Sequence, residues 1–219
     1  MSERGSLKGC AHDREMGVGM VGEANVPMLP PAPSVVWSAT VNGRIEEVLA
    51  PSNAILLDVL RDRVGQLGVK RGCDLGTCGC CAVLIDGEPR LSCMTLAGDA
   101  AGASITTVEG LADGHHLAPI QSCFAEFGGS QCGFCTPGFL VAAQALLNRT
   151  TNPSDEEIAE AIEGNLCRCT GYQPIIDSIK AAAEVLRGEA DRVEPRTLPH
   201  ADPHPAGQDE PNLPPGHAR

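Results

Sequence analysis

Most of the cysteines in this chain fall into two groups whose spacing could hold iron. The first group begins in the stretch RGCDLGTCGCC and follows the pattern Cys-x4-Cys-x2-Cys, with a fourth cysteine further on. This pattern is typical of plant-type [2Fe–2S] clusters, in which four thiolates hold two iron ions. The pattern leaves Cys80 as the spare cysteine. We expect its side chain to pack under the loop; the alternatives are a redox-labile thiol or a ligand swap. The four predicted ligands are Cys73, Cys78, Cys81 and Cys93.

A predicted β-hairpin brings the fourth of these cysteines to the third. The segment AVLIDGEPRLSC is expected to turn at Asp86-Gly87, a dipeptide that favours two-residue hairpin turns. In that register the numbers of paired residues sum to 173, so Cys81 faces Ser92 and Cys93 is next along. The loop glycines are expected to let the backbone curl until its N–H groups point at the sulfurs of an anionic cluster. These glycines are Gly72, Gly76 and Gly79.

The second group consists of two close pairs, Cys132-x2-Cys135 and Cys167-x-Cys169. Each pair stands just before a segment with helical character, TPGFLV in one case and GYQPIID in the other. The free N–H groups and the positive dipole end of a helix start suit an anionic cluster. Two converging helix starts would bring four thiolates together, so this group predicts a second cluster.

Disulfides and zinc are the alternative explanations for so many cysteines. The count of 11 is odd, so complete pairing is impossible, and neighbours such as Cys80 and Cys81 are poorly placed to bridge each other. Four-cysteine zinc sites also use C-x-x-C knuckles, but zinc ribbons separate two knuckles by about 15–20 residues. The two C-x-x-C pairs here, at Cys78 and Cys132, are much further apart. We therefore favour iron at both groups.

The other cysteines and the histidines fit ordinary structural roles. Cys10 lies in a segment without periodicity and is expected to be a bystander, whereas Cys123 falls in a predicted helix, where a small buried side chain is common. His115 and His116 precede that helix, and solvated or capping roles are favoured over metal binding. Solvated roles are also expected for the tail histidines His200, His204 and His217.

Composition excludes several classes of protein. The net charge is −12 without a basic stripe, which argues against binding to nucleic acid or anionic membranes. The sequence has no run of 18 or more apolar residues, so we expect no membrane span. We also expect neither a Sec-type signal, because no apolar h-region is found near the N-terminus, nor a twin-arginine signal, because no Arg-Arg pair is found. We therefore expect a cytoplasmic protein. The flanking segments 1–34 and 191–219 are expected to be a flexible leader and a disordered Pro-rich tail.

Residues 35–110 are expected to form a small α+β domain. Two β-prone runs flank Asn42-Gly43, the strongest short hairpin signal. A helix is expected within residues 52–65, with Ser52 or Asn53 as its cap. After the hairpin at the first cysteine group, the segment SITTVEG is expected to be the last strand.

Residues 111–190 are expected to be all helical, with four short amphipathic helices in a bundle. The first helix would carry Leu117, Ile120 and Phe124 on one face. The second would have Thr136 as its N-cap, and the third would open with a capping box from Ser154 to Glu157.

Three motifs, GCDLGTCGCCAVLIDGEPRLSC, QCGFCTPG and NLCRCTGYQPI, resemble those of a known family. They are similar to the iron–sulfur subunits of xanthine-oxidase-type molybdenum hydroxylases, which include carbon monoxide dehydrogenase small subunits and bacterial dehydrogenases of aldehydes, purines and N-heterocycles. The resemblance covers about residues 35–188. It implies an α+β fold, with an N-terminal plant-type ferredoxin (β-grasp) domain followed by a four-helix-bundle [2Fe–2S] domain. The chain departs from the family at Cys80, where the family usually has Ala, Ser or Gly.

The resemblance also implies roles for individual residues. The first four ligands would hold a [2Fe–2S] cluster distal to a molybdenum cofactor on a partner subunit. Gln131 would contact the pterin of that cofactor, and Cys169 would lie against the pterin as well. The ligands of a second, proximal [2Fe–2S] cluster would be Cys132, Cys135, Cys167 and Cys169.

The function implied by the resemblance is electron transfer within an oxidoreductase. Electrons would pass from the molybdenum cofactor of a large subunit, through two [2Fe–2S] clusters, to FAD on a medium subunit. The three subunits would form a heterotrimer, single or dimerised, and this chain would carry no catalytic residue and no substrate-binding site of its own. The alternative is a free-standing two-cluster ferredoxin that diffuses between partners; the second cluster and the QCGFC motif argue against it.

Overall fold

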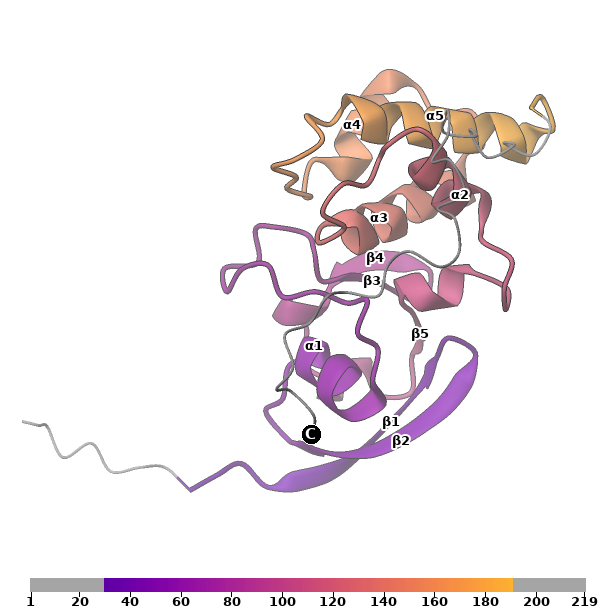
Figure 1. Cartoon of the computed structure of the whole chain (residues 1–219). Coiled ribbons are helices and arrows are strands. Elements are labelled where there is room, and N and C mark those ends of the chain that lie inside the picture. The colour runs from indigo at the N-terminus through magenta and orange to yellow at the C-terminus, as the bar shows by residue number, and fades with distance from the viewer. Residues whose placement is uncertain (1–29, 191–219) are drawn as a thin grey trace, which may run out of the picture. The chain divides into compact units, whose positions relative to one another are not determined.

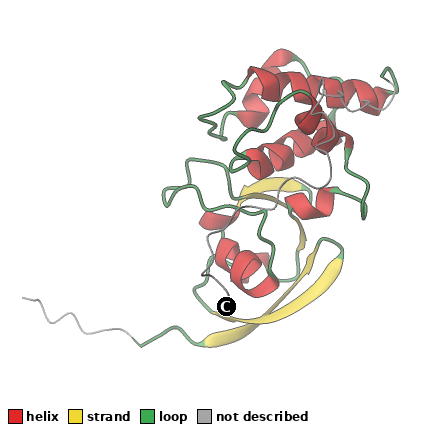
Figure 2. Cartoon of the chain, in the orientation of Figure 1, coloured by secondary structure: helices red, strands yellow, loops and turns green. Residues whose placement is uncertain are grey.

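The computed structural model describes residues 30–190, which form a mixed α+β fold (Figures 1 and 2). The five-stranded sheet has the order β2-β1-β5-β3-β4, in which β1 and β5 are parallel and the other neighbours are antiparallel. The leader up to residue 29 and the Pro-rich tail, both predicted from the sequence, lie outside the described residues. The strands are β1 (Ser34–Val41), β2 (Arg44–Pro51), β3 (Ala82–Ile85), β4 (Glu88–Leu91) and β5 (Ser104–Thr106). The helices are α1 (Leu56–Asp58), α2 (Pro119–Glu126), α3 (Thr136–Arg149), α4 (Asp155–Ile162) and α5 (Gln173–Arg187), with the π-helix η1 (Val59–Val64) and the 3-10 helices η2 (Ser92–Met94), η3 (Gly98–Ala100) and η4 (Val108–Leu111).

Both predicted hairpins are confirmed. Strands β1 and β2 join through Asn42 and Gly43, whose φ angles are 50° and 79°. Strands β3 and β4 join through Asp86 and Gly87, whose φ angles are 51° and 88°. Positive φ at both turn positions gives the turn whose twist matches the flanking strands, and Asn-Gly and Asp-Gly adopt it most readily. The predicted strand SITTVEG is confirmed only for its first three residues, which form β5; η4 follows.

The predicted cap of the first helix is wrong. Neither Ser52 nor Asn53 caps a helix, because α1 begins later, at Leu56, and no side chain caps it. The N–H of Leu56 instead donates to the carbonyl oxygen of Thr95, 2.8 Å away, so a neighbouring segment satisfies the free donor at the helix start. The helical turns continue as η1 and end at Gly65, which has left-handed backbone angles.

The four predicted helices after the sheet are present as α2–α5, and the predicted capping box is confirmed. The N–H of Glu157 donates to the Ser154 hydroxyl at 3.2 Å, and the N–H of Ser154 donates to the Glu157 carboxylate at 2.7 Å. Two details differ from the prediction. Helix α3 is capped by Cys135 rather than by Thr136, because the carbonyl of Cys135 accepts the first N–H bonds of the helix. Leu117 is 57% exposed, because α2 begins only two residues later.

Three buried apolar clusters hold these elements together. One lies between the sheet and α1, where Trp37 donates its indole N–H to the carbonyl of Ala97 at 2.7 Å. A second fills the space between α2, α3, α4 and α5. A third joins the other two, since Leu84 of β3 packs against Val141 and Ala145 of α3. Among the described residues, none of the helices combines the length and apolar character that crossing a bilayer requires.

The capping box gives a stability test. Replacing Ser154 with Ala removes the hydroxyl that accepts from Glu157, so we expect the free energy of unfolding to fall by about 1 kcal/mol. The matched control is Ser52→Ala, because Ser52 is exposed and caps no helix, so this variant should unfold like the wild type. Denaturant unfolding followed by circular dichroism measures both, and equal losses in the two variants would contradict the assigned cap.

Candidate metal centres

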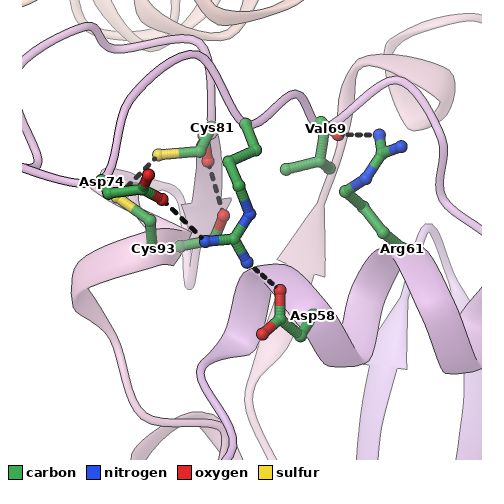
Figure 3. Close-up of polar contacts among 8 residues, drawn as sticks. Asp58, Arg61, Val69, Asp74, Cys81 and Cys93 are labelled. Carbon is green, nitrogen blue, oxygen red and sulfur yellow. Dashed lines mark hydrogen bonds and ion pairs between the residues drawn. The ribbon is translucent and has the colours of Figure 1, made fainter.

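Cys81 and Cys93 meet at the base of the second hairpin. Their sulfurs are 3.3 Å apart (Figure 3). The register predicted from the sequence produces this contact, because Ser92 faces Cys81 and donates both its N–H and its hydroxyl to the Cys81 carbonyl, at 3.3 and 2.7 Å. Burial and the neighbouring Cys81 thiol raise the pKa of Cys93 to about 12. A bound cation would therefore favour the thiolate form of Cys93.

Cys73 and Cys78 form the other half of the first group. Backbone N–H groups of Leu75 and Thr77 point at the Cys73 sulfur, and the Cys78 side chain contacts it. These hydrogen bonds stabilise a negative sulfur and lower the pKa of Cys73 to about 6. The curled loop expected from the glycines is thus present at Cys73, and Cys93 lies within electrostatic reach of both thiols.

The loop glycines meet two different needs. Gly76 and Gly79 have φ angles of +69° and +72°, which side chains rarely tolerate. Gly72 has an ordinary φ, but a Cβ at this position would lie 2.9 Å from the Cys78 sulfur and 3.0 Å from the Cys80 sulfur. The glycine at position 72 therefore leaves room for sulfur.

Cys80 is buried beside the first group, as expected of a spare cysteine. Its side chain is 4% exposed, and its sulfur lies 3.7 Å from the Cys78 carbonyl, to which it donates. Burial, followed by contact with the Cys78 thiol, raises the pKa of the Cys80 thiol to about 12. Its burial and its bond to the Cys78 carbonyl are those of a packed side chain.

An ion-pair network holds the start of the first loop. Arg71 pairs with Asp58 at the end of α1 and, at 3.3 Å, with Asp74 inside the loop (Figure 3). Nearby, Arg61 of η1 donates to the carbonyls of Leu67 and Val69. These contacts hold Leu67, Val69 and Arg71, which precede Cys73, against α1 and η1. The pairing of Arg71 with Asp58 could not be predicted from the motif, because Asp58 lies 13 residues before Arg71.

The second group is assembled from the starts of α3 and α5. The Cys132 and Cys169 sulfurs are 3.6 Å apart, and the Cys135 thiol contacts that of Cys167. Cys135 is itself the N-cap of α3. Burial, then the neighbouring Cys167 thiol, raises the pKa of Cys135 to about 12, whereas Cys132 and Cys169 are exposed. The group therefore has a half-buried side, with Cys135 and Cys167, and an exposed side, with Cys132 and Cys169.

Two residues after this group hold Cys167 in place. The Thr170 hydroxyl lies 3.1 Å from the Cys167 sulfur and the Thr170 N–H donates to that sulfur at 3.5 Å. The Tyr172 hydroxyl accepts from the Cys167 N–H at 3.0 Å. Burial opposes ionisation of Cys167, but the hydrogen bonds from Thr170 outweigh it and lower the pKa of the Cys167 thiol. Sequence reasoning did not identify Thr170 or Tyr172 as supports.

The arrangement of the thiols fits a two-iron cluster at each group. Every cysteine among residues 30–190 is a free thiol, and both groups are built from two sulfur pairs. A [2Fe–2S] cluster needs this division, with two thiolates on each iron. A single zinc ion would instead need all four sulfurs at about 2.3 Å from one point.

The two groups are neighbours in the fold. The N–H of Leu166 donates to the Cys78 carbonyl at 3.0 Å, and the Asn165 amide donates to the Gly79 carbonyl at 3.1 Å. A hollow of about 450 Å³ is lined by Cys78 and Cys80 together with all four cysteines of the second group. Nothing in the sequence spacing indicated this proximity.

The remaining candidates lie apart from the thiol groups or at their edge. Gln131, which the resemblance assigns to the pterin, is exposed next to Cys132. Cys123 is fully buried in the helical cluster, as predicted, and burial raises its pKa to about 11. His115 and His116 are exposed, as expected of solvated histidines.

Comparisons with known proteins first define the class. A family described as "2Fe-2S iron-sulfur cluster binding domain" matches residues 44–125, and one described as "[2Fe-2S] binding domain" matches residues 107–180. The chain is therefore a [2Fe–2S] iron–sulfur protein.

Individual relatives narrow the class to a family. The nicotinate dehydrogenase small FeS subunit of Eubacterium barkeri is 44% identical over 150 residues, which cover 68% of this chain and 96% of the relative. The caffeine dehydrogenase subunit gamma of Pseudomonas sp. (strain CBB1) is 48% identical over 162 residues, covering 71% of this chain and 97% of the relative. The aldehyde oxidoreductase of Megalodesulfovibrio gigas is 43% identical over 153 residues, covering 68% of this chain but only 17% of that longer protein.

A solved structure agrees with these relatives. A chain of quinoline 2-oxidoreductase from Pseudomonas putida 86 superimposes with a TM-score of 0.68 and 46% identity, covering 72% of this chain and 99% of that one. The chain belongs to the family of small iron–sulfur subunits of xanthine-oxidase-type molybdenum hydroxylases, and it is part of an oxidoreductase.

Adjacent cysteines provide a sharp test of the ligand set. We expect Cys80→Ala to keep full iron content, because the Cys-x4-Cys-x2-Cys spacing leaves Cys80 out and its sulfur donates to the Cys78 carbonyl. The matched variant Cys81→Ala removes one member of the pair with Cys93 and should lose the cluster at that group. Iron analysis and electron paramagnetic resonance (EPR) of the reduced protein measure both. Loss of the same signal in Cys80→Ala would make Cys80 a ligand.

Proposed function

We propose that this chain is the electron-transfer subunit of a molybdenum-containing hydroxylase and that it carries two [2Fe–2S] clusters. Electrons would pass from the molybdenum cofactor of a large subunit to FAD on a medium subunit. The observation that carries the proposal is the presence of two groups of four thiols, each divided into two contacting pairs, in a chain of this family.

The proposed ligands are the eight cysteines of the two groups. When bound, each cluster would take up and release one electron at a time. The distal site would use Cys73, Cys78, Cys81 and Cys93, and is called the first site below. The proximal site would use Cys132, Cys135, Cys167 and Cys169, and is called the second site.

The chain's own residues would set how readily each site holds extra negative charge. At the first site, the N–H groups of Leu75 and Thr77 donate toward the Cys73 sulfur. At the second site, the hydroxyl and N–H of Thr170 are directed at the Cys167 sulfur. Hydrogen bonds to ligand sulfurs and exclusion of water are the means by which a protein tunes such a potential. The remaining role of the chain is to keep the two sites at a fixed separation.

Exposed residues beside each site support the proposed partners. Gln131 and Cys169 are exposed at the second site, where the pterin of the large subunit would lie. Leu75 and Met94 are 80% and 68% exposed beside the first site, and large exposed apolar side chains of this kind favour contact with another protein. We assign the surface around Leu75 and Met94 to contact with the FAD subunit, so that the three subunits form a heterotrimer.

The sheet and helices support a finer description of the fold and location. We propose that the sheet with α1 is the β-grasp ferredoxin domain, up to about residue 110, and that α2–α5 form the four-helix domain that follows. Free thiols that must stay available for iron also favour the reducing cytoplasm.

Purification from the native host tests this function against a free-standing ferredoxin. We expect the chain to co-elute with a large molybdenum-containing subunit and an FAD-containing subunit. The loaded chain should contain four irons and four sulfides, because two [2Fe–2S] clusters hold that number. A lone chain of 22.8 kDa that carries both clusters would support the diffusible carrier instead. Two irons per fully loaded chain would show that one group of ligands is misassigned.

A hydrogen bond at the second site gives a prediction about potential. Thr170→Val removes the hydroxyl beside the Cys167 sulfur and so removes stabilisation of the more negative, reduced state. We expect the midpoint potential of one cluster to fall by about 40 mV, which corresponds to about 1 kcal/mol for one electron. The matched control is Thr151→Val, because Thr151 is exposed and away from both sites. An EPR-monitored redox titration measures both, and an unchanged or raised potential in Thr170→Val would contradict the assigned role.

A further inference from the structure

The first-site loop and the segment that carries Cys167 are joined by two adjacent hydrogen bonds. The Asn165 side-chain amide donates to the Gly79 carbonyl at 3.1 Å, across 86 residues of sequence. The next residue, Leu166, donates its N–H to the Cys78 carbonyl at 3.0 Å. Asn165 is 5% exposed, so its amide is largely shielded from water. Neither bond belongs to a helix or to the sheet.

Close backbone packing leaves no room for another arrangement at this point. A Cβ on Gly79 would lie 2.4 Å from the carbonyl oxygen of Gly164. A Cβ on Gly138, in the first turn of α3, would lie 2.3 Å from the carbonyl oxygen of Gly79. Real Cβ atoms do not approach backbone this closely. Gly79 is therefore held between the start of α3 on one side and the segment before Cys167 on the other.

The Asn165 segment is also fixed at the second site. Tyr172 donates its hydroxyl to the Asn165 carbonyl at 3.4 Å and accepts from the Cys167 N–H at 3.0 Å. The three residues from Asn165 to Cys167 are thus bonded to the first-site loop at one end and to the start of α5 at the other. A shift at Gly79 requires a shift of Cys167, unless one of these bonds breaks.

We propose that Asn165 is a positioning residue for both sites, so that the geometry of the first site depends on a side chain from the NLCRCTGYQPI motif. The inference rests on the proposed two-cluster function. Its basis is the Asn165–Gly79 hydrogen bond, together with the contact of Gly79 with Gly138 and Gly164. Asn165 touches no thiol of the first site through a side-chain bond, so its effect there acts through the backbone of Cys78 and Gly79.

The variant Asn165→Ala removes the side-chain hydrogen bond to Gly79 but leaves the nearby backbone groups with hydrogen-bond partners. The Gly79 carbonyl keeps its bond from the Ala82 N–H at 3.1 Å, and the backbone bonds of residue 165 to Ile162 and Tyr172 do not use its side chain. A second variant, Gly138→Ala, places a methyl group against the Gly79 carbonyl oxygen and the Asn165 amide nitrogen that bonds to it. Ala also favours helix over Gly, so this change acts through the contact rather than through loss of α3.

The experiment uses the full chain reconstituted anaerobically with iron and sulfide. Cys73→Ser and Cys132→Ser, each of which disables one site, assign the two EPR signals of the reduced protein. In Asn165→Ala we expect the first-site signal to shift and the first site to lose iron to a chelator about fivefold faster, which corresponds to about 1 kcal/mol, the net contribution of one hydrogen bond. Gly138→Ala should change the same signal.

Matched variants separate this role from general destabilisation. Asn148→Ala changes an exposed Asn on α3, and Gly98→Ala adds a methyl group with no atom within 4 Å; neither should move the first-site signal. If Asn165→Ala does not fold, as judged by circular dichroism, Gly138→Ala decides the question. A fully loaded variant whose first-site signal and iron loss equal those of the wild type overturns this inference alone. A wild-type chain that takes up no iron overturns the proposed function itself.

Discussion

Bringing four thiols into contact is the requirement on which both sites depend, because burial and neighbouring thiols oppose the ionisation of a thiol at each site. Burial raises the pKa of Cys93 and of Cys135 to about 12. The opposing influence is a set of aimed donors: N–H groups lower the pKa of Cys73 to about 6, and hydrogen bonds from Thr170 lower that of Cys167. Each site thus combines sulfurs that favour the thiolate with sulfurs that need a cation to reach it.

The two sites meet this requirement with different backbone. The first uses a glycine-rich loop, in which Gly76 and Gly79 take positive φ angles and Gly72 leaves space for sulfur. The second uses the start of α3, where Cys135 is both the N-cap and a member of the thiol group, and the segment before α5, where the Thr170 N–H donates to the Cys167 sulfur. The sheet and the helices pack together through α3, and this packing keeps the two thiol groups adjacent.

Features that depend on neighbouring residues could be predicted from the sequence. The turns at Asn42-Gly43 and Asp86-Gly87 and the capping box at Ser154 follow from chemistry within a few residues, and the hairpin register placed Cys93 beside Cys81. The predicted cap of the first helix is wrong because the N–H of Leu56 donates to the carbonyl of Thr95, which lies far along the chain. The contact between Asn165 and Gly79 was missed for the same reason. Periodicity and motif spacing carry no record of which distant backbone groups will meet.

The pairing of β3 with β4 has a consequence for how this chain can vary. Cys81 and Cys93 meet because the strands between them have a fixed length, while the side chains of β4 up to Arg90 are exposed. Cys93 lies in η2, just after β4, so inserting two residues into β4 would displace it along the hairpin by about 7 Å and separate it from Cys81. The exposed residues of β4 can therefore be substituted, whereas the number of residues between Cys81 and Cys93 cannot change without separating the two sulfurs.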